Sequence, residues 1–136
     1  MVTEGELRDL LARAGFVRDY GLRLAAFGDG VCTIHVPFQP GLERPGGVVG
    51  GPVFMAAADV AMWLAIVTRL GPADLSVTAD LKTTFLSPAR REDVFCTARV
   101  LKLGRRLIYG VAESVTADGR LLAHSTVSYA RPPARA

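Results

Sequence analysis

One carboxylate, Asp59, stands inside a long apolar stretch that follows a glycine-rich turn. The stretch runs from Gly46 to Leu70 and reads GGVVGGPVFMAAADVAMWLAIVTRL. Every residue from Val53 to Val67 except Asp59 is apolar. An ionised carboxylate in such surroundings is costly unless it is paired, hydrogen-bonded or open to a cavity. Asp59 is therefore either a structural residue bonded to a neighbour or a catalytic base or nucleophile.

The turn before this carboxylate favours the catalytic interpretation. Gly46, Gly47, Gly50 and Gly51 allow the backbone to approach a ligand closely, and the first N–H groups of a helix have no intrahelical acceptor. Such a helix start can stabilise an oxyanion. Glycines before a helix are also ordinary turn residues, and this turn lacks the Gly-Lys-Ser/Thr ending of a phosphate-binding P-loop.

The apolar stretch predicts the central helix of the fold. Pro52 suits a first helical position, so we expect the helix to begin near Pro52 and to continue to Val67. A helix that is apolar on all sides is either buried or in a membrane, and fifteen residues from Val53 are too few to span a bilayer comfortably. We expect burial on every side, with a second subunit covering part of this helix or the outer edge of the sheet.

The composition indicates a single soluble domain. The chain has 136 residues, half of them hydrophobic, and a net charge of +3. We expect one domain over residues 1–136, in the cytoplasm, with no nucleic-acid or membrane partner, because the arginines are scattered and no leader-like segment begins the chain. Cys32 and Cys96 lack metal-type spacing and are expected to be buried and free, so no metal site is predicted.

The other segments predict a short helix and an antiparallel sheet, hence an α+β fold. Thr3 and Glu6 have capping-box spacing, which predicts an amphipathic helix from Thr3 to Ala14 that ends at Gly15. A loop over Gln39–Gly47 leads to the central helix, and the proline-containing tail Arg131–Ala136 is expected to be loose. Alternation and turn residues predict strands that pair as meanders, at Tyr20–Ala26, Val31–Phe38, Val77–Phe85, Glu92–Leu103, Leu107–Thr116 and Arg120–Tyr129.

Several short motifs from Pro45 to Tyr129 are familiar in this order and spacing. They are Ala58-Asp59 in the helix, Val77-Thr78-Ala79-Asp80-Leu81 leading to Phe85-Leu86-Ser87-Pro88-Ala89, Gly104-Arg105-Arg106, Asp118-Gly119-Arg120 and Ala123-His124. With them the chain resembles the hotdog-fold acyl-CoA thioesterases, in particular the group related to the phenylacetate-pathway thioesterase. In that fold a curved antiparallel sheet wraps one long central helix.

The resemblance implies hydrolysis of an acyl-CoA thioester to a free acid and coenzyme A, with no cofactor because coenzyme A is part of the substrate. It implies that Asp59 is the catalytic acidic residue, that the Gly51 N–H polarises the thioester carbonyl, and that Thr78 positions the attacking water. It also implies that Gly50 and Arg44 are substrate-binding positions, where the family usually holds the thioester with a His and an Asn; here Gly50 replaces the His, and Arg44 replaces the Asn.

The spacing of two of these residues predicts an oligomer. Gly51 and Asp59 are eight residues apart, about 12 Å along a helix, so one carbonyl carbon cannot touch both. We therefore expect a homodimer or homotetramer whose active site crosses the dimer interface. Two sets of side chains are candidates for the rest of the substrate: Arg90, Arg91, Arg105 and Arg106 for the coenzyme A phosphates, and Phe54, Met55, Met62 and Trp63 for the acyl group.

Other activities fit the sequence less well. The chain has no Gly-x-Ser-x-Gly elbow, Cys32 and His35 should face opposite sides of a strand, and His124 is expected to be a hydrogen-bonded strand residue. The sequence lacks the Asp/His pair that a hydratase on this fold would be expected to need. The alternative that stays open is a non-catalytic acyl-CoA-binding or assembly module on the same fold.

Overall fold

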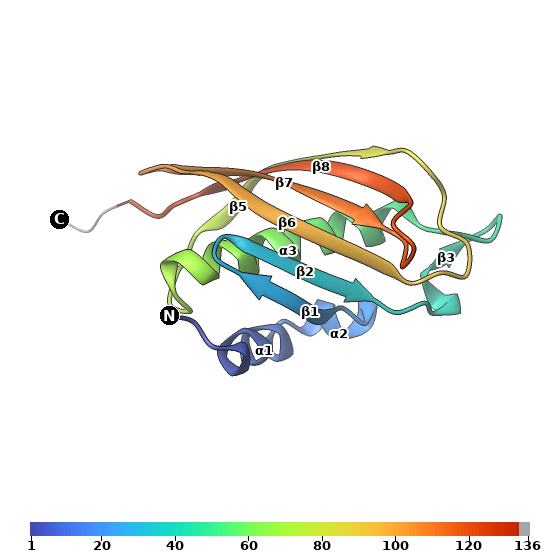
Figure 1. The fold of residues 1–136 in the computed structure, drawn as a ribbon, viewed down its shortest axis with the longest axis horizontal. Helices are drawn as coiled ribbons and strands as arrows, with labels where there is room; N and C mark the ends of the chain where they lie inside the picture. Colours follow the sequence, from blue (N-terminus) through green and yellow to red (C-terminus); the bar gives the residue numbers. More distant parts are fainter. Residues whose placement is uncertain (134–136) are drawn as a thin grey trace.

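The computed structural model describes residues 1–133 of the chain. A six-stranded antiparallel sheet curves around one long helix, α3 (Gly51–Leu70). Figure 1 shows α3 lying in the hollow of this sheet, and α3 contacts all six strands. The predicted α+β architecture is confirmed.

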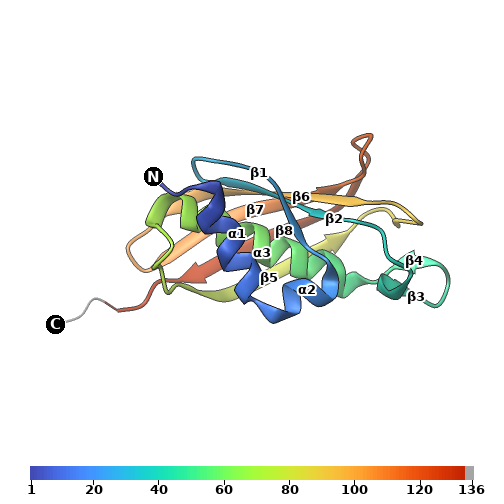
Figure 2. The same ribbon diagram turned by 90° about the horizontal axis from the view of Figure 1, so that it is seen from below.

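Two short helices, α1 (Glu4–Arg13) and α2 (Gly15–Tyr20), precede the first strand. The capping box predicted for α1 is present, because Thr3 accepts a hydrogen bond from the Glu6 N–H (3.1 Å) and its own N–H reaches the Glu6 carboxylate (2.9 Å). Such a cap stabilises a helix by about 1 kcal/mol. Figure 2 shows both helices lying across α3 and beside the outermost strand.

The helix α2 was not predicted. Ala14 has an extended backbone conformation, so α1 ends there. A new helix begins at Gly15, where the sequence predicts only the end of the first helix. Gly21, with a φ of 72°, ends α2, and β1 begins only at Arg23. A glycine such as Gly15 indicates the end of one helix, but it does not exclude a second helix directly after it.

The main sheet has the strand order β1-β2-β6-β7-β8-β5. Its strands are β1 (Arg23–Gly28), β2 (Val31–Val36), β5 (Val77–Phe85), β6 (Val94–Leu103), β7 (Leu107–Val115) and β8 (Leu121–Ala130). The meander holds for the last three strands, but β5 pairs with β8 and not with β6. The edge of β6 is taken by β2, so the chain leaving α3 adds β5 at the opposite edge of the sheet.

The segment predicted as a loop before α3 is more ordered than expected. It holds a 3-10 turn (Pro40–Leu42) and a small hairpin of β3 (Glu43–Arg44) and β4 (Val48–Val49). Gly46 (φ 106°) and Gly47 (φ 74°) make its turn in a backbone region that side chains disfavour. In Figures 1 and 2 this hairpin lies beside the N-terminal end of α3.

The helix α3 is longer than predicted. It has 20 residues, so length and composition would suffice to cross a membrane, and the argument from a fifteen-residue length is wrong. Burial is the better guide here: 61% of its most apolar window is covered by the rest of the chain. The covered side chains, including Met62, Leu64 and Ile66, form the core together with the inward faces of the strands.

Within the single chain α3 is not buried on every side, and the expected cover by a second subunit stays a prediction. Met55 is 38% exposed, and Asp59 and Trp63 are partly exposed, although the residues between them are mostly buried. These three positions are spaced by four and therefore share one face of the helix. This face, which we call the open stripe, is covered only in part by the rest of the chain.

Candidate active site

The carboxylate of Asp59 is held by two hydroxyl groups. The Thr78 hydroxyl donates to Oδ1 over 2.7 Å, and the Tyr129 hydroxyl donates to the same oxygen over 2.7 Å. Tyr129 also lies 3.1 Å from the main-chain oxygen of Asp59. No cation among residues 1–133 forms an ion pair with Asp59, so hydrogen bonds alone account for the carboxylate on the open stripe.

Sequence reasoning missed Tyr129. The residue is 4% exposed and belongs to the inward row of β8, and burial together with the Asp59 charge raises its pKa far above the ordinary range. A buried tyrosine hydroxyl usually finds a hydrogen-bond partner. That rule marks an inward-facing tyrosine as a candidate for the neighbourhood of a lone buried carboxylate, but it does not say which strand would meet Asp59.

A small cavity of about 200 Å³ opens beside this carboxylate. Its other walls are almost wholly apolar, and among residues 1–133 Asp59 is the only charged residue that lines it. The cavity lies between the open stripe of α3 and the junction of α1 and α2; its lining residues are Ala14, Phe16, Asp59, Val60, Trp63 and Tyr129.

A backbone donor lies at the other important position, the start of α3. Gly51 is the first residue of the helix, where N–H groups lack intrahelical acceptors. The Gly50 N–H is used by Leu42 O (3.0 Å), the Val53 N–H by Gly50 O (3.1 Å), and Pro52 has none. Among residues 1–133, no acceptor outside the helix is found for the Gly51 N–H.

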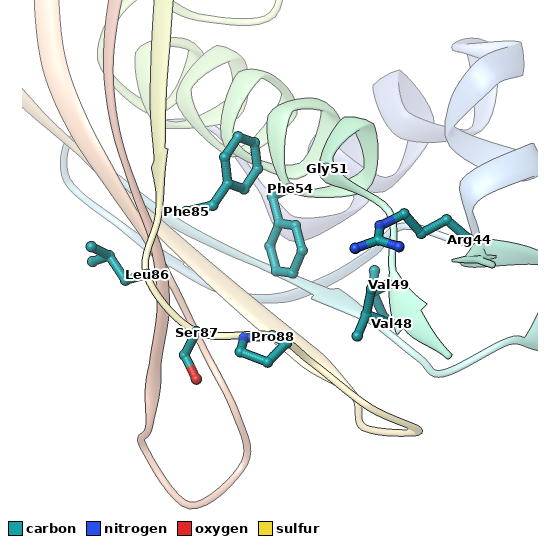
Figure 3. A pocket seen from close by; sticks show the side chains of 9 residues that line it. All are labelled: Arg44, Val48, Val49, Gly51, Phe54, Phe85, Leu86, Ser87 and Pro88. Atoms are coloured by element: carbon teal, nitrogen blue, oxygen red, sulfur yellow. The ribbon is translucent and has the colours of Figure 1, made fainter. Parts of the chain in front are cut away.

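A second cavity, of about 340 Å³, is open at Gly51. Figure 3 shows the aromatic rings of Phe54 and Phe85 on one side of it and the Arg44 guanidinium on the other. A methyl group added to Gly51 would lie 3.3 Å from the Phe85 ring, so the glycine allows this close approach. The cavity is completed by residues of the β3–β4 hairpin and of the segment after β5.

Gly51 and Asp59 thus line different cavities of the same chain. The structure brings Asp59 and Thr78 together, as expected for catalytic partners, and it brings Gly51 and Arg44 together. It does not bring the two pairs together within one subunit, in agreement with the separation of about 12 Å along the helix.

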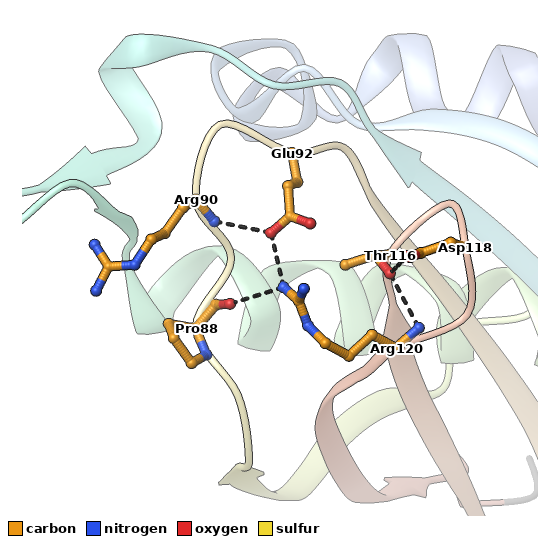
Figure 4. Close-up of polar contacts among 6 residues, drawn as sticks. All are labelled: Pro88, Arg90, Glu92, Thr116, Asp118 and Arg120. Carbon is orange, nitrogen blue, oxygen red and sulfur yellow. Dashed lines mark hydrogen bonds and ion pairs between the residues drawn. The ribbon is translucent and has the colours of Figure 1, made fainter.

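Arg44, Arg90 and Arg91 lie at the Gly51 end of the sheet. The Arg90 guanidinium donates to Gly46 O (3.0 Å) and so ties the segment after β5 to the β3–β4 turn, whereas Arg91 has a positive φ of 49°. Next to them, Arg120 donates to Glu92 (2.8 Å) and to Pro88 O (3.1 Å), as Figure 4 shows.

The Glu92 carboxylate is the common acceptor of this network. The backbone N–H of Arg90 and then the Arg120 side chain lower the pKa of Glu92 below its usual value. Figure 4 shows both contacts converging on the same carboxylate, beside the Thr116 to Arg120 turn. The network braces the loop that carries Arg90 and Arg91.

Arg105 and Arg106 lie at the opposite end of the sheet, in the β6–β7 turn. They border an open hollow of about 930 Å³ together with Arg131. The Arg131 N–H bonds to Arg106 O (2.8 Å) and its guanidinium to Gly104 O (3.0 Å), so the described part of the tail is attached to this turn. Residues 134–136 of the tail lie outside the described residues. The four arginines predicted for phosphate binding therefore form two separate groups in one chain.

The four side chains considered for the acyl group are also separated. Phe54 lines the Gly51 cavity and Trp63 the Asp59 cavity. Met62 is fully buried under Gly110, so the structure places it in the core. Met55 lies on the open stripe and lines neither of the two cavities.

The cysteines and histidines offer no alternative centre. Burial raises the pKa of Cys32 to about 12 and that of Cys96 to about 11, so both remain uncharged thiols. His35 lies on the other face of the strand, bonded to Asp93 (2.9 Å) and stacked on Phe95. His124 bonds to Glu113. Residues 1–133 hold no cluster of metal-ligating side chains.

Comparison with known proteins identifies the family. A family model described as the thioesterase superfamily matches residues 46–123, which contain Gly51, Asp59 and Thr78. The chain belongs to the thioesterase superfamily. A protein of Saccharolobus solfataricus named "Putative esterase SSO2140" is 32% identical over 100 residues, which cover 74% of this chain and 71% of that protein.

Solved structures agree on the fold of this thioesterase-superfamily chain. The thioesterase HI1161 from Haemophilus influenzae has a TM-score of 0.86 at 25% identity, covering 96% of this chain and 90% of the other. The PaaI protein of the E. coli phenylacetic acid degradation operon has a TM-score of 0.85 at 15% identity, covering 95% and 92%. The hotdog fold and the family resemblance are confirmed, and the general chemistry supported is hydrolysis of a thioester or ester.

Proposed function

We propose that this protein hydrolyses an acyl-CoA thioester to a free acid and coenzyme A. The observation that carries the proposal is the Asp59 carboxylate, which is held by two hydroxyl donors on the open stripe and opens on an apolar cavity. A carboxylate without a cationic partner in such a place is a candidate base or nucleophile. The family membership supports the class of reaction.

The proposed reaction uses Asp59 and Gly51 on one thioester. Asp59 either takes a proton from water as the water oxygen bonds to the carbonyl carbon, or attacks that carbon itself to form an anhydride, which water cleaves to the free acid once coenzyme A has left. The Gly51 N–H stabilises the negative charge that develops on the carbonyl oxygen. The C–S bond then breaks, and coenzyme A leaves as a thiolate that takes up a proton. The Thr78 hydroxyl donates its single hydrogen to Asp59, and its lone pairs remain available to accept a hydrogen bond from water.

A second copy of the chain is the proposed partner that completes the site. The strand β5 lies at the edge of the sheet, with one side unpaired in the single chain, and such an edge is a template for pairing. Its first part carries Thr78, bonded to Asp59, and its last residue, Phe85, lies on Gly51. Antiparallel pairing of two β5 strands about a twofold axis sets the Thr78 end of one beside the Phe85 end of the other. Asp59 of one subunit then approaches Gly51 of its partner.

The same pairing gives the two arginine groups a common role. Arg105 and Arg106 lie at the end of the sheet where β5 begins, and Arg90 and Arg91 follow its other end. In the proposed dimer the first pair of one subunit and the second pair of the other flank the same site. We propose that they contact the coenzyme A phosphates, for which arginine is well suited.

The test is a thiol-release assay over acyl-CoAs from aryl to long-chain, with the wild-type protein and the Asp59→Asn variant. The matched control is Asp19→Asn, the same chemical change at an exposed position of α2, away from the strand proposed to pair. Turnover that Asp59→Asn abolishes and Asp19→Asn preserves supports the proposal. If the wild type binds acyl-CoA without any thiol release, the protein is instead a non-catalytic acyl-CoA-binding module. This alternative is tested because Gly50 replaces the family His and Arg44 replaces the Asn.

A further inference from the structure

The two donors that hold Asp59 are neighbours in the sheet. Thr78 and Tyr129 are register partners on β5 and β8, and both side chains reach Oδ1 of Asp59 over 2.7 Å. No hydrogen bond from residues 1–133 to the other oxygen, Oδ2, is found. The carboxylate therefore has one occupied oxygen and one that is open for chemistry.

The two donors differ in how firmly they are held. Thr78 is exposed and belongs to the edge strand β5. Tyr129 is 4% exposed and belongs to β8, where it is paired with Ile108 on one side and Thr78 on the other. A ring enclosed in this way has little freedom to change rotamer, so its hydroxyl is a fixed reference point for the carboxylate.

Tyr129 acts as a donor and not as a proton carrier. Burial, followed by the charge of Asp59, raises its pKa above its usual value of about 10, so the hydroxyl stays protonated at physiological pH. Its hydrogen is directed at Oδ1 and lies near the main-chain oxygen of the same residue as well.

From these contacts we infer that Tyr129 is a positioning residue, which fixes the Asp59 carboxylate so that Oδ2 is the oxygen that acts on water or on the thioester. The inference rests on the proposed function. It applies equally to a general base and to a nucleophile, since both need one unshared oxygen held in a reproducible direction. A purely structural hydroxyl would be satisfied by the main-chain oxygen 3.1 Å away and would not depend on the carboxylate.

The test compares Tyr129→Phe in two backgrounds, wild type and Asp59→Asn, by steady-state kinetics on an acyl-CoA that the wild type hydrolyses. Phenylalanine keeps the ring and removes the hydroxyl alone. In the wild-type background we expect kcat to fall by roughly 10-fold with KM within about 2-fold, the pattern of a group that acts on the transition state. In the Asp59→Asn background we expect no further loss, because a positioning residue has no effect once its target is gone.

The control is Tyr109→Phe, the same change at a tyrosine that is 40% exposed, and it should leave kcat unchanged. The inference is overturned if Tyr129→Phe keeps full activity while Asp59→Asn is inactive, or if it lowers activity by the same factor in both backgrounds. Loss of cooperative thermal unfolding in Tyr129→Phe would make the hydroxyl structural and would also overturn it. Absence of turnover in the wild type overturns the proposed function itself, and the positioning role with it.

Discussion

The hydroxyl of Thr78 lies 2.7 Å from Oδ1 of Asp59, although Thr78 belongs to the edge strand and Asp59 to the central helix. This bond connects the helix to the strand that is free to pair with another chain. Any chain that pairs with β5 therefore lies next to the Asp59 carboxylate. Pairing at this edge can thus affect the position of the candidate catalytic residue through the Thr78 contact.

Replacing Asp59 by Asn separates a catalytic role from a structural one. The amide oxygen can still accept hydrogen bonds from Thr78 and Tyr129, but the side chain can no longer take a proton or attack. We expect hydrolysis to fall by about 10²-fold or more, the usual scale of general-base catalysis. The melting temperature should not fall, because no cation among residues 1–133 is left without a partner. A variant that melts early but keeps wild-type turnover would contradict the catalytic assignment.

Mixed subunits test whether the site crosses between chains. Asp59→Asn removes one half of the proposed site, and Gly51→Val places a branched side chain over the other half, against Phe85. In a mixed dimer with the site shared between subunits, one site carries both changes and the other carries none. Co-refolding the two variants in equal amounts should therefore restore about a quarter of wild-type activity per subunit in a twofold dimer.

The controls for this experiment are the two variants refolded separately, which should stay inactive, and light scattering, which should give at least a dimer. If both catalytic groups came from the same chain, every subunit in the mixture would carry one lesion and no activity would return. A stable, active monomer would likewise contradict the shared site.

Restoring the family histidine should raise turnover. The backbone at Gly50 has a φ of −66°, and a Cβ added there would lie 3.6 Å from Leu42 O and 3.7 Å from the Pro52 ring, which are ordinary contacts. A Cβ therefore fits without backbone strain, and we expect Gly50→His to increase kcat/KM severalfold with little change in melting temperature. Unchanged or lower activity would indicate that the site is adapted to another substrate, and Arg44, which lines the same cavity as Gly51, would be the next residue to vary.

Acid should weaken the contact at Asp93. The Phe38 N–H (2.8 Å) and then His35 (2.9 Å) lower the pKa of this carboxyl. A lowered pKa in the folded state means that the stabilisation is fully present above the unfolded value, near pH 4, and is lost as the pH falls through the lower folded value. Asp93 is 42% exposed, so solvent screens the effect, and we expect a difference of only a few degrees in melting temperature.

The measurement is the melting temperature of wild type and Asp93→Asn from pH 6 to pH 2.5. The advantage of the wild type should be constant above about pH 5 and should shrink below pH 4. An advantage that stayed the same down to pH 2.5 would show that the contact does not depend on the carboxylate charge.

Local features of the sequence determined much of this protein. The Thr3 capping box, the helix that starts at Gly51 and Pro52, and the alternation along β5 each depend on the conformational preferences of neighbouring residues, so a short window predicts them. Asp59 was recognisable for a similar reason, because a single carboxylate among apolar residues needs a partner or a cavity wherever it lies. The spacing of Gly51 and Asp59 on one helix also placed them too far apart to act on one carbonyl group within a chain.

Only the tertiary structure decided which residues meet. Tyr129 is 70 positions from Asp59, and Phe85 reaches Gly51 from the end of β5. These contacts depend on β5 pairing with β8 at the edge of the sheet instead of with β6, and local preferences do not encode that choice. It follows from how six strands close around one helix: β2 occupies the edge of β6, so β5 takes the far edge. That placement brings the hydroxyl of Thr78 beside the hydroxyl of Tyr129, with both directed at the same oxygen of Asp59.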